Sequence, residues 1–146
     1  MKKIIELSFL KGKEGWGLLA LRLGLGIVFV YAGWSKFQSV GTVGFFTSIG
    51  IPLPNVAAPL IAGIELIGGM FLILGIFTRI AALLLSGVMA VAILVVHGPL
   101  IMKLIVENGD LLGDLKQFGL LGGTLALVLN GAGPFSCDSM LLRGKK

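Results

Sequence analysis

The chain has 146 residues, of which 56% are hydrophobic and only 13% charged, and its formal net charge is +5. A mean hydropathy of +1.03 places it outside the range of soluble proteins. The composition therefore indicates an integral membrane protein. No hydrophilic segment is long enough to bury a second core, so we expect a single domain over residues 1–146.

The N-terminal segment, residues 1–16, mixes apolar residues with lysines and ends in Trp16. This pattern is compatible with a short interfacial helix anchored by an aromatic ring, and equally with a frayed tail. It does not indicate a cleaved signal peptide. The apolar run that follows carries Arg22 in its interior, and Trp34, Ser35 and Lys36 stand where small cleavage-site residues would lie.

Four apolar runs predict membrane-spanning helices over about residues 17–37, 56–77, 80–97 and 116–133. Each is close to the roughly 17–25 residues that cross a bilayer, and none shows the period-two alternation of a barrel strand. The predicted fold class is all-α, an integral membrane four-helix bundle. Small residues recur in all four runs, where they would allow close helix packing or a homo-oligomer interface. They are Gly24, Gly26, Gly63, Gly68, Gly69, Gly87, Gly119, Gly122 and Gly123.

The distribution of basic residues predicts the orientation. With four spans, one side of the membrane receives both termini and the turn before the third helix, with Lys2, Lys3, Lys11, Lys13, Arg79, Arg143, Lys145 and Lys146. The other side receives Lys36, Lys103 and Lys116. This bias predicts a multi-pass protein of the cell membrane with both termini in the cytoplasm. The net charge then reflects topology and attraction to anionic lipid, and indicates no nucleic-acid partner.

The two connections on the outer side differ in character. The first, residues 35–55, combines phenylalanines with glycines and ends in Pro52-Leu53-Pro54, so we expect it to dip back into the membrane interface. The second, residues 98–117, carries acids and leucines that suggest a short amphipathic helix. The acids are Glu107, Asp110 and Asp114, and the leucines are Leu111, Leu112 and Leu115. A solvated charged face is the simpler interpretation of the acids, and a hard-cation site the weaker one.

Arg22 is the only charge between residues 17 and 33, and Glu65 is the only charge between residues 56 and 77. A charge inside a bilayer is costly and usually paired, so each predicts the other as its partner. By helical rise, Arg22 would lie about 6 Å to the cytoplasmic side of mid-membrane and Glu65 close to it, within reach of a guanidinium. The pair would either fix helix packing or line a polar pocket that binds or moves a ligand.

Other chemistry is sparse. Cys137 is the only cysteine and His97 the only histidine, so the chain alone provides no disulfide relay, bis-histidine haem or multi-histidine metal site. No phosphate-binding loop, dinucleotide fingerprint or catalytic triad occurs. We therefore predict no metal site, no cofactor motif within the chain and no self-contained catalytic motif.

Four segments occur in a fixed order along the chain: LRLGLGIVFVYAGWSKF, IGIPLP, GIELIGGMFLILGIFTR and NGAGPFSCDSM. Together they resemble the DoxX family of small membrane proteins, and the resemblance covers residues 19–142. It implies a four-helix membrane protein that serves as a small subunit or partner in a quinone-linked oxidoreductase system. Carried over by position, the polar intramembrane site of the family would comprise Arg22, Lys36, Glu65 and Asp138.

Asp138 gains a role from this resemblance. The Gly-Ala-Gly-Pro break at residues 131–134 would turn it back toward Arg22 or Arg79, whereas without the resemblance it would be an exposed acid of the C-terminal tail. Two functions of different class follow. The protein is either an oxidoreductase subunit whose polar interior holds a quinone head group or an oxyanion and passes protons, or a non-catalytic assembly partner or small-molecule binding module whose ion pair is structural.

Overall fold

The computed structural model describes residues 14–97 and 111–143 of the chain. Its elements in chain order are α2 (Glu14–Gln38), α3 (Gly41–Ser48), α4 (Pro54–Leu74), α5 (Thr78–Ala92), the π-helical turn η2 (Ile93–His97), α7 (Leu111–Asn130) and α8 (Cys137–Arg143). These segments contain no strand, and the predicted all-α class is confirmed.

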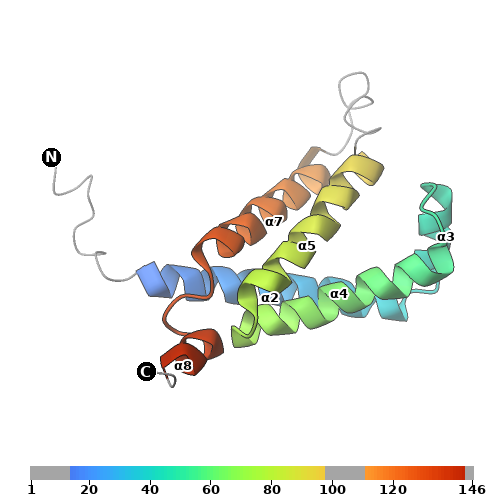
Figure 1. The fold of residues 1–146 in the computed structure, drawn as a ribbon. Coiled ribbons are helices and arrows are strands. Elements are labelled where there is room, and N and C mark those ends of the chain that lie inside the picture. The colour runs from blue at the N-terminus through green and yellow to red at the C-terminus, as the bar shows by residue number, and fades with distance from the viewer. Residues whose placement is uncertain (1–13, 98–110, 144–146) are drawn as a thin grey trace, which may run out of the picture.

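The four long helices form two antiparallel pairs (Figure 1). Helix α2 lies along α4, and α5 lies along α7, while contacts of α4 with α5 and of α2 with α7 join the pairs. The short helix α3 covers one end of α4, and α8 lies near the turn between α4 and α5, close to the start of α2. The bundle therefore has an α3 end and an α8 end.

Three described helices are long and apolar enough to cross a membrane: Gly15–Gln38, Pro54–Leu74 and Thr78–Val95. Helix α7 has 20 residues, but its first turns carry Asp114, Lys116 and Gln117, so its apolar part begins at Phe118. The chain is thus a membrane protein of helical architecture. The short amphipathic helix expected in the second connection is wrong as a separate element, because Leu111 to Leu115 are the first turns of α7.

Two glycines end helices earlier than the apolar runs predict. Helix α4 ends at Leu74, because Gly75 adopts a left-handed conformation with φ 68°. Helix α7 ends at Asn130, because Gly131 has φ 76°. Glycine takes this conformation without the penalty that a side chain would bring. Each turn sharply redirects the chain, and both turns lie at the α8 end.

Helices α2 and α4 pack backbone against backbone. A Cβ atom on Gly33 would lie 2.5 Å from Leu66 N, and one on Gly26 would lie 2.8 Å from Gly69 O. Small residues at such crossings let helices approach where lipid supplies no hydrophobic drive. The predicted packing role is confirmed for Gly26, Gly68, Gly69 and Gly123. For Gly24, Gly63, Gly87, Gly119 and Gly122, an added Cβ would have no neighbour within 4 Å in the described part of the chain, so the alternative role in a homo-oligomer interface stays a prediction for them.

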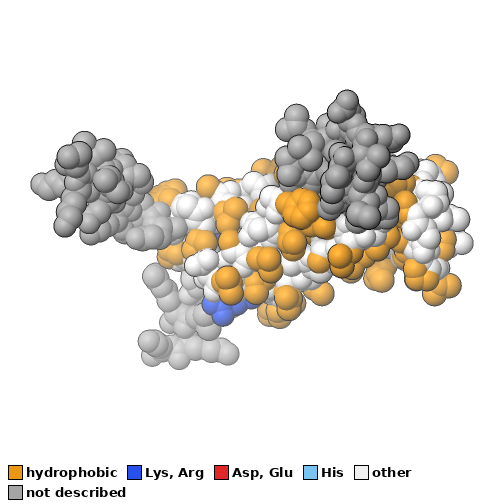
Figure 2. Space-filling model, turned by 90° about the horizontal axis from the view of Figure 1, so that it is seen from above, with side chains coloured by type: hydrophobic (Ala, Val, Ile, Leu, Met, Phe, Trp, Pro, Cys, Tyr) orange, Lys and Arg blue, Asp and Glu red, His pale blue; other side chains and the backbone are white. Residues whose placement is uncertain are grey.

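The interior is small and the outer surface is apolar. The buried core comprises Leu25, Phe29, Leu72, Ala81, Ala82, Leu85, Met89 and Leu127. One polar contact crosses it, from the Ser86 hydroxyl to Thr124 Oγ1 at 2.9 Å. Hydrophobic side chains cover much of the face shown in Figure 2, and large ones such as Tyr31 and Leu94 are more than 70% exposed. Such a surface suits contact with lipid tails.

The first connection folds back onto the bundle. In α3, Phe46 is buried against the protein, as expected for a segment that turns inward, whereas Phe45 remains half-exposed. Pro54 then starts α4, where a proline fits because its missing N–H has no helical partner. Residues 1–13 of the predicted interfacial helix lie outside the described residues. Glu107 and Asp110 of the second connection lie outside them as well.

Candidate functional site

The ion pair predicted between Arg22 and Glu65 does not form. Both side chains are only 2% exposed, but Glu65 pairs with Lys36, and Arg22 binds backbone oxygens. The reason is the register of α2 against α4. Contact of Gly33 with Ala62 and Leu66 sets Glu65 near the level of Gly33, eleven residues beyond Arg22. That offset is about 16 Å along a helix, too far for a guanidinium to bridge.

Arg22 instead holds the loop that follows α7. Its Nη1 donates to Ala132 O at 2.6 Å, and its Nη2 donates to Phe135 O at 2.9 Å. Its Nε has no hydrogen-bond partner among the residues the structure describes. A Cβ on Gly75 would lie 2.7 Å from Nη1, so the guanidinium fills the space between the α4–α5 turn and this loop. The contacts of Arg22 are those of a structural clamp.

Asp138 makes an ordered contact, as expected, but its partners are backbone amides. Its Oδ1 accepts a hydrogen bond from Phe77 N at 2.8 Å, and its Oδ2 accepts one from Thr78 N at 3.0 Å. Its own N–H donates to Gly75 O at 2.9 Å. A carboxylate at a helix N-terminus satisfies free N–H groups and interacts favourably with the helix dipole. Asp138 therefore caps α5 and fastens α8 to the α4–α5 turn.

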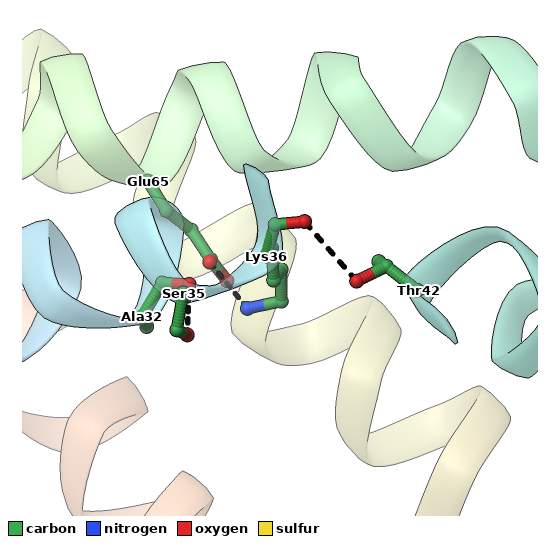
Figure 3. Close-up of polar contacts among 5 residues, drawn as sticks. All are labelled: Ala32, Ser35, Lys36, Thr42 and Glu65. Carbon is green, nitrogen blue, oxygen red and sulfur yellow. Dashed lines mark hydrogen bonds and ion pairs between the residues drawn. The ribbon is translucent and has the colours of Figure 1, made fainter. Parts of the chain in front are cut away.

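Lys36 and Glu65 form the ion pair of the bundle interior (Figure 3). Lys36 Nζ, from the last turn of α2, donates to Glu65 Oε2 in the middle of α4. The Lys36 side chain is 29% exposed, whereas that of Glu65 is 2% exposed. The backbone oxygen of Lys36 accepts a hydrogen bond from the Thr42 hydroxyl of α3 at 3.2 Å. Helix α3 is thereby tied to the pair.

A cavity of about 200 Å³ opens beside this pair. Its walls come from all four long helices and from α3, with Phe45 and Phe46 among many aliphatic side chains. Besides the pair, Gln117 of α7 lines it, and the Oε1 atom of Gln117 is buried without a hydrogen-bond partner among the described residues. The π-helical turn η2 follows directly after the α5 wall, and such turns are frequent at functional sites.

Gln117 was missed from the sequence, because it stands at the edge of the fourth apolar run and looked like a boundary residue. Its only signal was its polarity, directly before the uncharged apolar stretch that starts at Phe118. The four residues carried over by position thus divide into two groups. Lys36 and Glu65 meet at the α3 end beside Gln117, whereas Arg22 and Asp138 lie at the α8 end.

A second, wider pocket of about 610 Å³ lies at the α8 end, around Arg79 and the loop after α7. Asp138 lines it, but both of its carboxylate oxygens already accept backbone hydrogen bonds. The Arg79 guanidinium makes a long contact of 3.4 Å with Leu129 O. Among the described residues, no group of three potential metal ligands occurs at either end. The cavity at the α3 end is lined by an ion pair with a buried carboxylate and by a residue with an unsatisfied acceptor, and we take it as the candidate site.

Comparison with known proteins gives one family. The DoxX family model matches residues 17–98. "Putative oxidoreductase CatD" of Bacillus subtilis is 38% identical over 132 residues, covering 89% of this chain and 90% of that protein. "Inner membrane protein YqjF" of Escherichia coli is 29% identical, and the alignment covers 90% of this chain and 97% of that protein. "Inner membrane protein YphA", also of Escherichia coli, is 27% identical, with 83% of this chain and 87% of that protein covered. No solved structure matches the chain.

Proposed function

Since this chain belongs to the DoxX family, we propose that it is a small subunit or partner of a quinone-linked membrane oxidoreductase system. The cavity beside Lys36 and Glu65 would hold the quinone head group. A relative carrying an oxidoreductase name supports the redox part of this proposal, and the apolar helices provide access to a lipid-soluble ligand.

The observation that carries the proposal is an ion pair at the wall of a cavity, with a buried carboxylate and a partly exposed ammonium. Burying a charge is costly, and well-packed apolar residues would often stabilise a helix contact as well. A charged pair whose ammonium also faces an open space has a further use, because it can donate hydrogen bonds to a ligand there. Only the Lys36–Glu65 pair has this arrangement among the described ion pairs.

The size and walls of the cavity suit a single ring. Sites for drug-sized ligands enclose roughly 300–1,000 Å³, so a cavity of about 200 Å³ accepts only a smaller group. Phe45 and Phe46 provide aromatic surface for such a ring. Phe45 and Val91 are about half-exposed on the outer surface of the bundle, which offers a route from the bilayer. The ring would enter between α3 and α5 and leave an isoprenoid tail in the lipid.

The residues at this site would bind and orient the ligand. Lys36 would donate to a ring oxygen, and Glu65 would hold the ammonium in place and accept a proton when the ring oxygen loses one. When bound, a quinone supplies the two-electron redox chemistry that the protein lacks. A partner protein would take up the two electrons that the ring releases as its oxygens lose their protons.

We also propose that this is a multi-pass cell-membrane protein with both termini in the cytoplasm. The basic-residue bias supports that orientation, and the printed names of two relatives support an inner membrane. With the start of α2 on the cytoplasmic side, Lys36 and the cavity lie toward the outer side, and the Arg22 clamp lies toward the cytoplasm.

A purely structural function remains the alternative, in which the protein is an assembly partner and its buried charges hold helices together. The contacts of Arg22 favour it for the α8 end, because they all reach backbone oxygens. At the α3 end, this alternative predicts that removing both charges leaves every binding property unchanged.

Two tryptophans allow a direct binding test. Trp34 precedes Lys36 by two residues on α2, whereas Trp16 packs against Phe135 at the α8 end, with ring centroids 4.7 Å apart. Trp16→Phe and Trp34→Phe thus create proteins that report from one end only. In detergent, we expect a short-chain benzoquinone to quench Trp34 fluorescence saturably and Trp16 fluorescence only in proportion to concentration.

The double variant Lys36→Met, Glu65→Leu removes both charges without leaving one unpaired. In the Trp34 reporter, this variant should lose the saturable quenching. Equal, non-saturable quenching of both tryptophans, or saturable quenching that survives the double substitution, would contradict a quinone site at the pair.

A further inference from the structure

The side-chain amide of Gln117 bears on which hydrogen-bonding groups a ligand in the cavity must have. Its Oε1 is buried and lacks a hydrogen-bond partner among the described residues, yet the residue lines the cavity beside Lys36 and Glu65. Buried polar atoms are nearly always hydrogen-bonded in folded proteins, so an exception calls for an explanation. Because Gln117 lines the cavity, a ligand bound there can supply the missing donor.

The donors and acceptors around the cavity define that ligand. Lys36 has three N–H donors, and Glu65 accepts from one of them, so the ammonium can also donate to a ligand oxygen. Gln117 Oε1 can only accept. A group that satisfies both must accept from Lys36 and donate to Gln117. A hydroxyl does both with one oxygen, whereas a ring carbonyl can only accept.

We propose that the cavity selects the reduced, dihydroxy form of its ring ligand, the quinol, over the quinone. This inference rests on the function proposed above and goes beyond it by assigning the redox state that the site prefers. Gln117 is the specificity-determining residue. The quinol hydroxyl accepts from Lys36 Nζ and donates to Gln117 Oε1, whereas a bound quinone leaves that oxygen unsatisfied.

The expected preference is about tenfold in dissociation constant, the typical effect of leaving one buried polar group without a partner. The same reasoning gives a result in the absence of ligand. Gln117→Leu removes an unsatisfied buried acceptor, so the free protein should become slightly more thermostable while its ligand preference disappears.

The test compares a short-chain benzoquinone with its quinol, kept reduced under anaerobic conditions, by titration of the full-length protein in detergent. Four proteins are titrated: wild type, Gln117→Leu, Gln117→Glu and Gln38→Leu. Gln117→Glu retains an acceptor at the same place. Gln38 is the other glutamine of the chain and is exposed at the end of α2, so Gln38→Leu is a matched control.

We expect wild type, Gln117→Glu and Gln38→Leu to bind the quinol about tenfold more tightly than the quinone, and Gln117→Leu to bind both equally. If wild type binds both forms equally or prefers the quinone, this inference is overturned while the quinone site stands. A preference unchanged in Gln117→Leu overturns it as well. If neither form binds saturably, the proposed function fails and the inference fails with it.

Discussion

Removing one partner of the Lys36–Glu65 pair should have very different effects depending on which partner is removed. Lys36→Met leaves the Glu65 carboxylate without its partner, and this side chain is only 2% exposed and cannot reach water. An uncompensated buried charge typically costs about 3–5 kcal/mol. Glu65→Leu leaves Lys36 without its partner, but this side chain is 29% exposed and has a flexible stem at the end of α2. Its ammonium can move toward water, so the expected loss is only about 1 kcal/mol.

Thermal unfolding in a mild detergent measures this asymmetry. For a domain of this size, 1 kcal/mol corresponds to roughly 3 °C in Tm. We expect Lys36→Met to lower Tm by about 9–15 °C and Glu65→Leu by about 3 °C. The double variant should recover most of the loss of Lys36→Met, because no charge remains unpaired.

A double-mutant cycle between Arg22 and Glu65 is the control. Arg22 and Glu65 are offset by about 16 Å along their helices, so Arg22→Met and Glu65→Leu should be additive within about 0.5 kcal/mol. Equal losses for the two Lys36–Glu65 single variants would refute the reasoning from exposure. Additivity between Lys36 and Glu65, or strong coupling between Arg22 and Glu65, would refute the register of α2 against α4.

Three further predictions concern packing, capping and orientation. Gly33→Leu should prevent stable folding or lower Tm sharply, because the new side chain would meet the α4 backbone. Gly24→Leu, where an added Cβ has no neighbour, should change Tm by less than about 2 °C. Equal effects of the two substitutions in circular dichroism melts would contradict the α2–α4 contact. Asp138→Ala should cost about 1–2 kcal/mol through loss of the α5 cap, and a Tm equal to that of wild type would exclude this role. In a cysteine-free background, an impermeant thiol reagent applied from outside should label Ser39→Cys and spare Arg79→Cys, and the reverse pattern would invert the proposed topology.

The sequence by itself determined the class of protein and the approximate positions of its long helices. Hydropathy over a window of about twenty residues is a local property, so it locates membrane-spanning segments without knowledge of their neighbours. Burial of the charges at Arg22 and Glu65 followed from the same logic, and both are indeed buried. Helix ends were less accurate, because left-handed glycines such as Gly75 stop a helix inside an apolar run.

Only the tertiary structure decided which charges meet. The partner of Glu65 depends on how far α4 slides along α2, and that register is set by close contacts of Gly26 and Gly33 with the opposite backbone. A shift of about three helical turns would bring Arg22 to the level of Glu65 without changing any local pattern. Gln117 reaches the cavity only because α7 packs beside α5. Hydropathy records how much each residue favours lipid or water, whereas a binding site depends on contacts between distant segments, which no single segment encodes.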